Sequence, residues 1–428
     1  MRRKASIIEN IDLLTVVLFA SMVVLGWLNI YASVYDPSTA FGSLSQGLFD
    51  LNNNAGKQLI FVGIAIAVAI VILVIDDKMF DSLAYPIWGF FVLLLILVLL
   101  FAREVNGARS WIEIGAFRFQ PAEFMKFATA LALAKYVSQP SFKMNSLKDI
   151  TMVGLFIGVP AVLIILQGDT GTALVFTVFI LVMFREGMSA FPLIVGVITA
   201  VIFLLALLVK EHIYLWAGVE IIAGLVVLFG KKSFKRIALV LITSALVIGM
   251  FESVDYAFTN WLKPHQQNRI MVLLNPNVDP LGVGWNVTQS KIAIGSGGVS
   301  GKGFLQGTQT TFDFVPEQST DFIFCTIGEE HGWVGSLMLI SLFITLLLRL
   351  IYLAERQKWK FVRIYGYSVV SILFFHFSVN IGMTIGLFPV IGIPLPMFSY
   401  GGSSLLSFTI LLFIFLSLDA NRMMRLEH

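Results

Sequence analysis

Long apolar runs, separated by short polar or turn-rich breaks, dominate this chain. A helix that crosses a bilayer needs about 20 mostly apolar residues. The pattern predicts twelve such helices, at residues 12–33, 58–75, 84–102, 121–137, 150–167, 171–185, 190–209, 213–230, 236–253, 332–353, 364–387 and 402–419. Because a helix satisfies its own backbone hydrogen bonds, hydrocarbon can surround such a bundle. We therefore expect an all-α polytopic membrane protein with about twelve transmembrane helices.

The composition agrees with this pattern. Of the 428 residues, 57% are hydrophobic and 13% are charged, whereas about a quarter of the residues in a soluble domain are charged. The 29 basic and 26 acidic residues are nearly balanced and form no basic tail, so no nucleic-acid partner is expected. Cys325 is the one cysteine and excludes an intrachain disulfide, and no two histidines have a zinc-ligand spacing. A water-soluble globule is excluded.

Lysine and arginine residues are distributed unevenly over the predicted loops. Basic loops are retained on the cytoplasmic side, and this rule predicts that both termini are cytoplasmic. Residues 254–321, between the ninth and tenth spans, then form one long extracytoplasmic loop. A connection of this length usually binds something or covers a site, so the loop is the main functional candidate. Residues 426–428 are interpreted as the remainder of an expression tag.

Three ionisable residues fall at or near membrane depth, where burial is costly and each is a functional candidate. Glu123 and Lys126 follow Pro121 at the start of a predicted helix and lie three positions apart on one face, so they can pair. The alternative is a purely structural ion pair. Asp169 lies between two short apolar runs, at a junction that resembles the interrupted helices of polar cavities. It equally suits a helix cap in a tight outer turn.

Two further groups lie near the tenth and eleventh spans. Asp321 and the run Glu329-Glu330-His331 crowd the entrance of the tenth span, either as a cavity wall or as a solvated edge. His376 and Asn380 are four positions apart in the eleventh span, and we expect them to bond to each other or across helices rather than to bind a metal.

The long loop contains turn signals and glycines. Asn275-Pro276 and Asp279-Pro280 are typical of turns, where an aspartate usually serves the turn itself. Gly301-Lys302-Gly303 lacks the hydroxyl residue that follows the lysine of a phosphate-binding P-loop. Glycine-rich backbone beside Lys302 can nevertheless approach a phosphate closely.

Taken together, several motifs closely resemble the SEDS family (shape, elongation, division and sporulation). They are Asn106-Gly107-Ala108-Arg109-Ser110-Trp111-Ile112, Phe119-Gln120-Pro121-Ala122-Glu123, Gln289-Ser290, Pro316-Glu317, Thr320-Asp321-Phe322, Gly392-Ile393-Pro394-Leu395-Pro396 and Ser399-Tyr400-Gly401-Gly402-Ser403-Ser404. The loop sequences Asp279-Pro280-Leu281-Gly282 and Gly301-Lys302-Gly303-Phe304 are most similar to the members that act in cell elongation. The resemblance covers the chain except for about 190–230, and it implies a core of ten spans to which residues 190–230 add an extra helix pair.

The resemblance implies a peptidoglycan glycosyltransferase of the bacterial cytoplasmic membrane that polymerises lipid II on the outer side. Its implied partners are a class B penicillin-binding protein and other elongasome components. Asp279 matches the family's essential loop aspartate, and Glu123 and Lys126 match its paired residues beside a central cavity. Candidate substrate-binding residues are Arg109, Asp169, Arg269, Gln289, Lys302, Glu317, Asp321 and Ser403. No organic cofactor is expected, whereas a divalent cation, Mg²⁺ or Mn²⁺, is implied.

On this hypothesis Asp279 acts as the general base that takes the proton of an acceptor hydroxyl during one inverting displacement. Arg109, Lys126, Arg269 and Lys302 are candidates for stabilising the departing pyrophosphate. Three alternatives remain open: a lipid II flippase, an ion-coupled transporter that uses Glu123, Lys126 and Asp169 as a proton relay, and a scaffold that only activates its partner.

Overall fold

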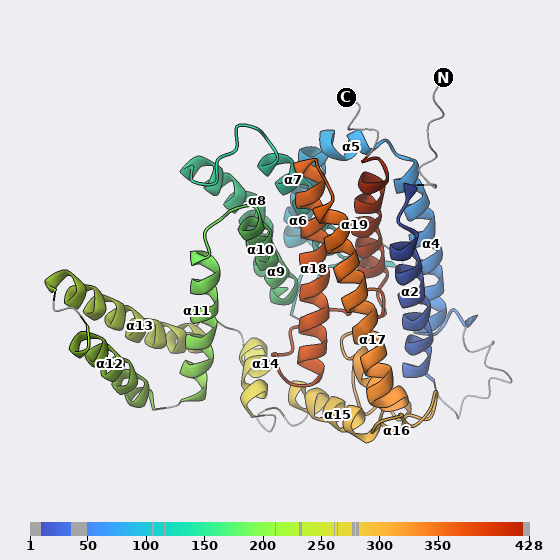
Figure 1. Ribbon diagram of the computed structural model, residues 1–428. Coiled ribbons are helices and arrows are strands. Elements are labelled where there is room, and N and C mark those ends of the chain that lie inside the picture. Colours follow the sequence, from blue (N-terminus) through green and yellow to red (C-terminus); the bar gives the residue numbers. More distant parts are fainter. Residues whose placement is uncertain are drawn as a thin grey trace. The chain divides into compact units, whose positions relative to one another are not determined.

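The computed structural model describes residues 10–35, 49–104, 107–114, 117–209, 211–230, 233–260, 262, 264–275, 279 and 282–422 (Figure 1). The proposed tag remainder at residues 426–428 lies outside them. The α-helices are α2 (Leu13–Ser33), α4 (Asn54–Val74), α5 (Asp77–Ser82), α6 (Ala84–Phe101), α7 (Pro121–Val137), α8 (Leu147–Leu166), α9 (Thr170–Val175), α10 (Phe179–Arg185), α11 (Phe191–Leu208), α12 (His212–Leu228), α13 (Phe234–Asn260), α14 (Pro264–Leu274), α15 (Val283–Ser296), α16 (Thr308–Thr311), α17 (Ile323–Glu355), α18 (Lys360–Thr384) and α19 (Gly402–Ala420). One 3₁₀ helix, η1 (Phe176–Val178), joins α9 to α10, and strands β1 (Ile112–Ile114) and β2 (Phe117–Phe119) form an antiparallel hairpin.

The chain divides into two compact units, Ser189–Trp285 and the remainder. In the larger unit, α7 is enclosed by α6, α8, α18 and α19. Nearly all of α7 is buried, including Ala128, Ala130, Ala132 and Ala134. Small side chains let helix backbones approach closely inside a membrane bundle. This explains how a helix that carries Glu123 and Lys126 can form the centre of the bundle, where it does not meet lipid.

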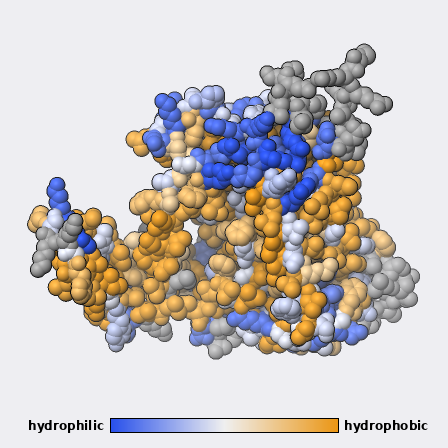
Figure 2. Space-filling view, in the orientation of Figure 1, coloured by the Kyte–Doolittle hydropathy of each residue, from blue (hydrophilic) through white to orange (hydrophobic). Residues whose placement is uncertain are grey.

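The outer helices of the larger unit have the opposite character. Only a minority of the residues of α4, α6 and α8 are buried, and side chains such as Val74, Phe101 and Leu166 are largely exposed. Figure 2 shows hydrophobic side chains over the middle of this bundle and hydrophilic ones gathered at its ends. Among the described residues, nine helices are long and apolar enough to cross a membrane. The protein is a multi-pass membrane protein, as the apolar pattern predicts.

All twelve predicted spans coincide with helices, although α7, α9 to α10 and α12 are shorter or more polar than the other nine. The tenth span differs most, because the prediction begins it at residue 332 whereas α17 begins at Ile323. Gly332 has φ 61° and interrupts the helix there. The turn before this interruption carries Glu329 and Glu330, so hydropathy detected only the later part of α17.

Four backbone groups explain how the interruption of α17 is tolerated. In an unbroken helix, the N–H groups of Trp333 and Val334 would donate to the carbonyls of Glu329 and Glu330. Here these two N–H groups donate to the carbonyls of residues 298 and 299. The carbonyls of Glu329 and Glu330 accept instead from the N–H groups of residues 302 and 303, and all four bonds are 2.9–3.1 Å long. The segment 298–303 is thus inserted into the backbone ladder of α17, and the opened helix keeps its hydrogen bonds.

The smaller unit contains α11, α12, α13 and α14. Helices α11 and α12 both pack on α13, and Ile202, Ala206 and Phe251 form the centre of a small apolar cluster. The stretch predicted as a long loop, residues 254–321, is largely helical where it is described, because α13 extends to Asn260 and α14, α15 and α16 follow. The turn signals at Asn275 and Asp279 fall between α14 and α15.

Candidate active site

The predicted pairing of Glu123 with Lys126 is confirmed. The Lys126 Nζ donates to Glu123 Oε2 at 2.9 Å, and the two side chains are 1% and 4% exposed. The Ser407 hydroxyl on α19 donates to the Glu123 carbonyl at 2.7 Å, which ties this turn of α7 to its neighbour. An ion pair this well enclosed at the first turns of a spanning helix is a functional candidate.

His376 on α18 completes this buried group. Its Nε2 lies 3.0 Å from Lys126 Nζ, and its Nδ1 lies 3.1 Å from the Pro394 carbonyl oxygen. Asn380 instead donates to the carbonyls of Asp321 and Ile393, each at 2.8 Å. Both side chains therefore bond across helices and segments, which is one of the two predicted alternatives.

Asp169 is a helix cap, as one of its two interpretations predicts. Its Oδ1 accepts from the Thr172 N–H at 3.0 Å at the start of α9, and its Oδ2 accepts from Gln120 Nε2 at 2.7 Å. Ser403 also meets this region, because its hydroxyl donates to the Arg118 carbonyl and accepts from the Gln120 N–H. Asp169 and Ser403 thus both hold the entry to α7.

Lys302 lies beside Glu329, whose side chain is 0% exposed. The Lys302 ammonium donates to Glu329 Oε1 at 2.7 Å and to the Thr308 hydroxyl at 2.7 Å. Glu329 also accepts from the N–H groups of Gln309 and Thr310. Glu329 and Glu330 are both buried, so they do not form a solvated edge. A phosphate would have to compete with this carboxylate for the Lys302 ammonium.

The side chains of the remaining candidates of the larger unit make other contacts, although the Arg109 N–H donates to the Gln167 carbonyl at 2.7 Å, close to Asp169 in the chain. Arg109 Nε is 3.6 Å from Glu104 Oε2, and both side chains are about half exposed. Gln289 is buried on α15. Glu317 has φ 58° and accepts from the Thr320 hydroxyl at 2.8 Å.

Asp279 belongs to the smaller unit and is half-buried just before α15. Its Oδ2 accepts from the Val283 N–H at 3.0 Å, and no partner of Oδ1 is found among the described residues. A Cβ on Gly282 would lie 2.5 Å from Oδ2, so glycine leaves the room that the carboxylate occupies. Arg269, on α14 of the same unit, is also half-buried.

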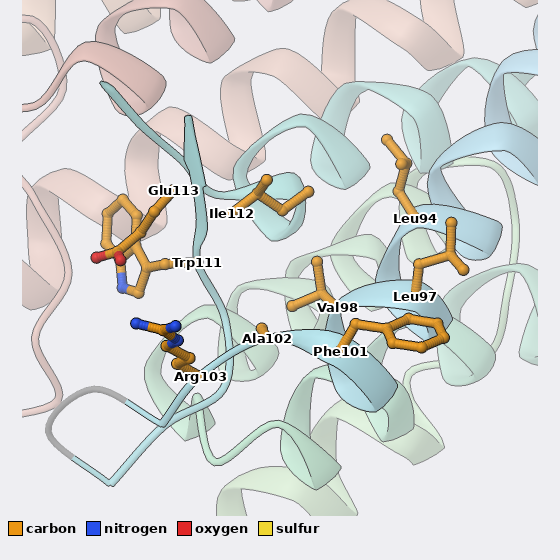
Figure 3. A pocket seen from close by; sticks show the side chains of 9 residues that line it. All are labelled: Leu94, Leu97, Val98, Phe101, Ala102, Arg103, Trp111, Ile112 and Glu113. Atoms are coloured by element: carbon orange, nitrogen blue, oxygen red, sulfur yellow. The ribbon is translucent and has the colours of Figure 1, made fainter. Parts of the chain in front are cut away.

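A pocket of about 550 Å³ lies along the end of α6, and the sequence did not predict it. Figure 3 shows apolar side chains of α6, including Leu97 and Phe101, on one side and Arg103, Trp111 and Glu113 on the other. A long apolar span that ends in arginine, with tryptophan and glutamate a few residues later, was the available signal. The pocket combines an apolar slot with a cation at its rim.

The described side chains offer no ready-made site for the implied divalent cation. Among the described residues, no three histidine, cysteine, aspartate or glutamate side chains come together at metal-binding distance. Proteins normally hold Mg²⁺ through one or two carboxylates, and water and substrate phosphate complete its coordination shell. The described side chains therefore do not form a closed metal site.

The fold and these buried charges define a polytopic helical membrane protein whose central helix carries an enclosed ion pair. A family model described as a cell cycle protein, covering FtsW, RodA and SpoVE, matches residues 12–217 and 216–424. The chain therefore belongs to the FtsW/RodA/SpoVE family, which is the SEDS family that its motifs resemble.

Individual relatives are similar over most of their length. The chain is 32% identical to peptidoglycan glycosyltransferase RodA of Treponema pallidum, covering 97% of this chain and 99% of the relative. It is 33% identical to peptidoglycan glycosyltransferase MrdB of Escherichia coli strain K12, covering 87% and 86%. Among solved structures, it resembles rod shape determining protein RodA of Thermus thermophilus, with a TM-score of 0.62 at 26% identity over 96% of this chain and 97% of that one.

It also resembles a chain from a structure described as the structural coordination of polymerization and crosslinking by a peptidoglycan synthase complex. That TM-score is 0.66 at 28% identity, and the match covers 96% of this chain and 98% of the other.

Proposed function

We propose that this protein is a peptidoglycan glycosyltransferase that polymerises glycan strands from lipid II during cell elongation. Its family membership, and the names of relatives at 32% and 33% identity over most of the chain, support this function. The structural similarity to a chain of a peptidoglycan synthase complex supports a partner that crosslinks the strands, namely a class B penicillin-binding protein with other elongasome components.

The geometry of Asp279 carries the chemical part of the proposal. A sugar hydroxyl is a poor nucleophile at neutral pH, and a positioned carboxylate that takes its proton contributes about 10²- to 10⁴-fold. The Val283 N–H holds Oδ2 at the start of α15, while Oδ1 has no partner among the described residues. One oxygen therefore orients the carboxylate and the other can accept the proton. Attack opposite the leaving group then inverts the anomeric carbon.

The rim of the pocket on α6 suits the lipid-linked pyrophosphate of the donor. Lys126 and Lys302 are held closely by carboxylates, at 2.9 and 2.7 Å. Arg109 makes only a looser contact with Glu104, at 3.6 Å between half-exposed side chains, and Arg103 lines the pocket. In this proposal, the two arginines stabilise the negative charge that develops on the departing pyrophosphate. The apolar side of the pocket binds the first part of the lipid chain.

The orientation is part of the same proposal. The end of α17 that carries Arg349 and Arg356 binds Asp12, just before α2, and Asp419, near the end of α19. The start of α2 and the end of α19 therefore lie on the same side of the bundle. Together with the basic loops, this supports cytoplasmic termini. The number of predicted spans that precede Asp279 in the sequence then implies that this residue is extracytoplasmic.

The decisive experiment is polymerisation of labelled lipid II by the purified protein in detergent. We expect glycan strands from the protein alone and longer or faster synthesis with its penicillin-binding partner. A parallel series with a chelator tests the divalent cation. Translocation of lipid II across sealed vesicles without any polymer would instead identify a flippase and reject the proposal.

Asp279→Asn tests the general base, because it keeps the shape and removes the basicity. We expect polymerisation to fall about 10²- to 10⁴-fold with little change in thermal stability. Asp76→Asn is the matched control, since Asp76 also accepts a backbone N–H at a helix start, from Lys78 at 2.9 Å. If Asp279→Asn kept the original rate, the base would lie elsewhere.

A further inference from the structure

His376 lies at the point where three segments of the larger unit meet. It is 0% exposed on α18. Its ring contacts Lys126 of α7 and the Pro394 carbonyl through its two nitrogens, at 3.0 and 3.1 Å. The ring of Phe408 on α19 is nearly perpendicular to it, at 88°, with centroids 4.9 Å apart. Neither nitrogen is left without a partner.

These partners determine the form of the imidazole. A carbonyl oxygen can only accept a hydrogen bond, so the Nδ1 that faces Pro394 must carry the proton. A lysine ammonium can only donate, so the Nε2 that faces Lys126 must present its lone pair. An imidazolium would direct an N–H at a cation 3.0 Å away. His376 is therefore neutral and protonated on Nδ1.

The ammonium of Lys126 is fully engaged in this arrangement. It has three N–H donors, and it meets Glu123 Oε2 at 2.9 Å, His376 Nε2 at 3.0 Å and the face of the Phe408 ring at 4.6 Å. With 1% of its side chain exposed, it has no direction left in which to bind substrate. Lys126 can act on the reaction only through the groups that it holds in place.

The Pro394 side of His376 leads to hydrogen bonds that join two connecting segments. Asn380, one turn along α18, donates to the carbonyls of Ile393 and Asp321. The Ser399 hydroxyl donates to the Thr320 carbonyl at 2.6 Å. The Tyr400 N–H donates to the Ser319 carbonyl at 2.8 Å. The segment 392–400 is thus bonded to residues 319–321, and most of these residues belong to the motifs that resemble the family.

We infer that His376 is a positioning residue. It accepts a hydrogen bond from Lys126 and donates one to the Pro394 carbonyl. Through it, the buried Glu123–Lys126 pair on α7 holds the segment 392–400 in the arrangement that the reaction needs. This inference rests on the proposed function, because its kinetic consequence is measured as polymerisation. Small displacements of groups that position a substrate reduce rates by about 10²-fold. The effect should fall on kcat, since His376 is enclosed and does not touch substrate.

Three substitutions separate the two bonds of the ring. His376→Gln places an acceptor near Nε2 and keeps the bond to Lys126, His376→Asn places a donor near Nδ1 and keeps the bond to Pro394, and His376→Phe keeps only the ring volume and its contact with Phe408. Each variant breaks at least one of the two bonds of the bridge, and the Phe variant breaks both. We therefore expect kcat to fall about 10- to 100-fold in all three, with KM within about twofold. If Phe matched the wild type and exceeded Gln, the ring would serve packing alone and the inference would fail.

A second measurement does not depend on variants of His376. Replacing the other four of the five histidines by glutamine leaves one imidazole for ¹⁵N NMR. We expect a proton on Nδ1 and a bare Nε2 at neutral pH. A proton on Nε2, or on both nitrogens, would overturn the inference. Absence of polymer from the wild-type protein would reject the proposed function instead. The NMR spectrum would still test the hydrogen bonds of His376, because it does not depend on activity.

Discussion

At the scale of single residues, the Glu123–Lys126 pair is not explained by stability alone. Removing two charges from water costs several kcal/mol for each ion, and apolar replacements of a buried pair are often neutral or stabilising. Here the Lys126 ammonium also has His376 and the face of Phe408 as partners, which lowers that penalty. We interpret the pair as a group that defines one arrangement of α7, α18 and α19.

A double-mutant cycle tests this coupling. Glu123→Ala or Lys126→Ala alone leaves an uncompensated charge in the bundle, and each should destabilise the protein by about 3–5 kcal/mol and reduce polymerisation. The double variant should lose clearly less than the sum, because the charge left by one change is removed by the other. Thermal unfolding in detergent and lipid II polymerisation are the measurements, and strict additivity would show that the two side chains act independently.

At the scale of elements, α17 depends on glycine at its interruption. A Cβ on Gly301 would lie 2.1 Å from the Glu330 carbonyl oxygen, and Gly301 has φ 80°. Only glycine adopts this backbone without strain and lets the segment 298–303 reach the opened ladder. The interruption also places Glu329 where it accepts hydrogen bonds from the Lys302 ammonium and from the N–H groups of Gln309 and Thr310.

Gly301→Ala should therefore destabilise the protein by at least about 2 kcal/mol, from left-handed strain and weakened backbone hydrogen bonds. Gly295→Ala is the matched control, because Gly295 lies within α15 and a Cβ there meets nothing within 4 Å. Alanine in that helix should be neutral or stabilise by up to about 1 kcal/mol. Equal shifts of the two unfolding temperatures would contradict the close approach.

At the scale of the whole larger unit, ion pairs join helices at one end of the bundle. Arg349 and Arg356 on α17 bind Asp12 and Asp419, and Arg363 on α18 binds Glu186. Burial alone would raise the pKa of Asp12, but hydrogen bonds from Arg349 and Thr15 lower it from 3.8 to about 2. The carboxylate form of Asp12 therefore stabilises the contact of α2 with α17.

The sign of this effect predicts a pH dependence. Because the folded pKa of Asp12 is depressed, its stabilisation is fully present above about pH 4 and is lost as the pH falls toward 2. Asp12→Asn should unfold with about 1 kcal/mol less stability than the wild type at pH 6, a modest value because Arg349 is 30% exposed and screened by solvent. The gap should narrow below about pH 4 and close only below about pH 2, and a gap that stayed constant with pH would exclude the carboxylate as its cause.

The amino-acid sequence by itself determined the helical spans, the pairing of Glu123 with Lys126 and the capping role open to Asp169. Span length, a spacing of three residues on a helix and the preference of aspartate for helix starts are local properties, so they can be read from neighbouring positions. The motif resemblance also identified the family, which the comparisons confirm.

Only the tertiary structure decided which distant groups meet. Lys126 and His376 are 250 positions apart, and nothing local in either helix marks the other as its partner. The opening of α17 and the helical character of residues 283–296 likewise depend on segments that supply backbone hydrogen bonds or packing from elsewhere in the chain. Buried polar groups must find partners wherever the fold brings them, so the contacts of His376, Lys302 and Glu329 follow from the packed bundle and not from the sequence around each residue.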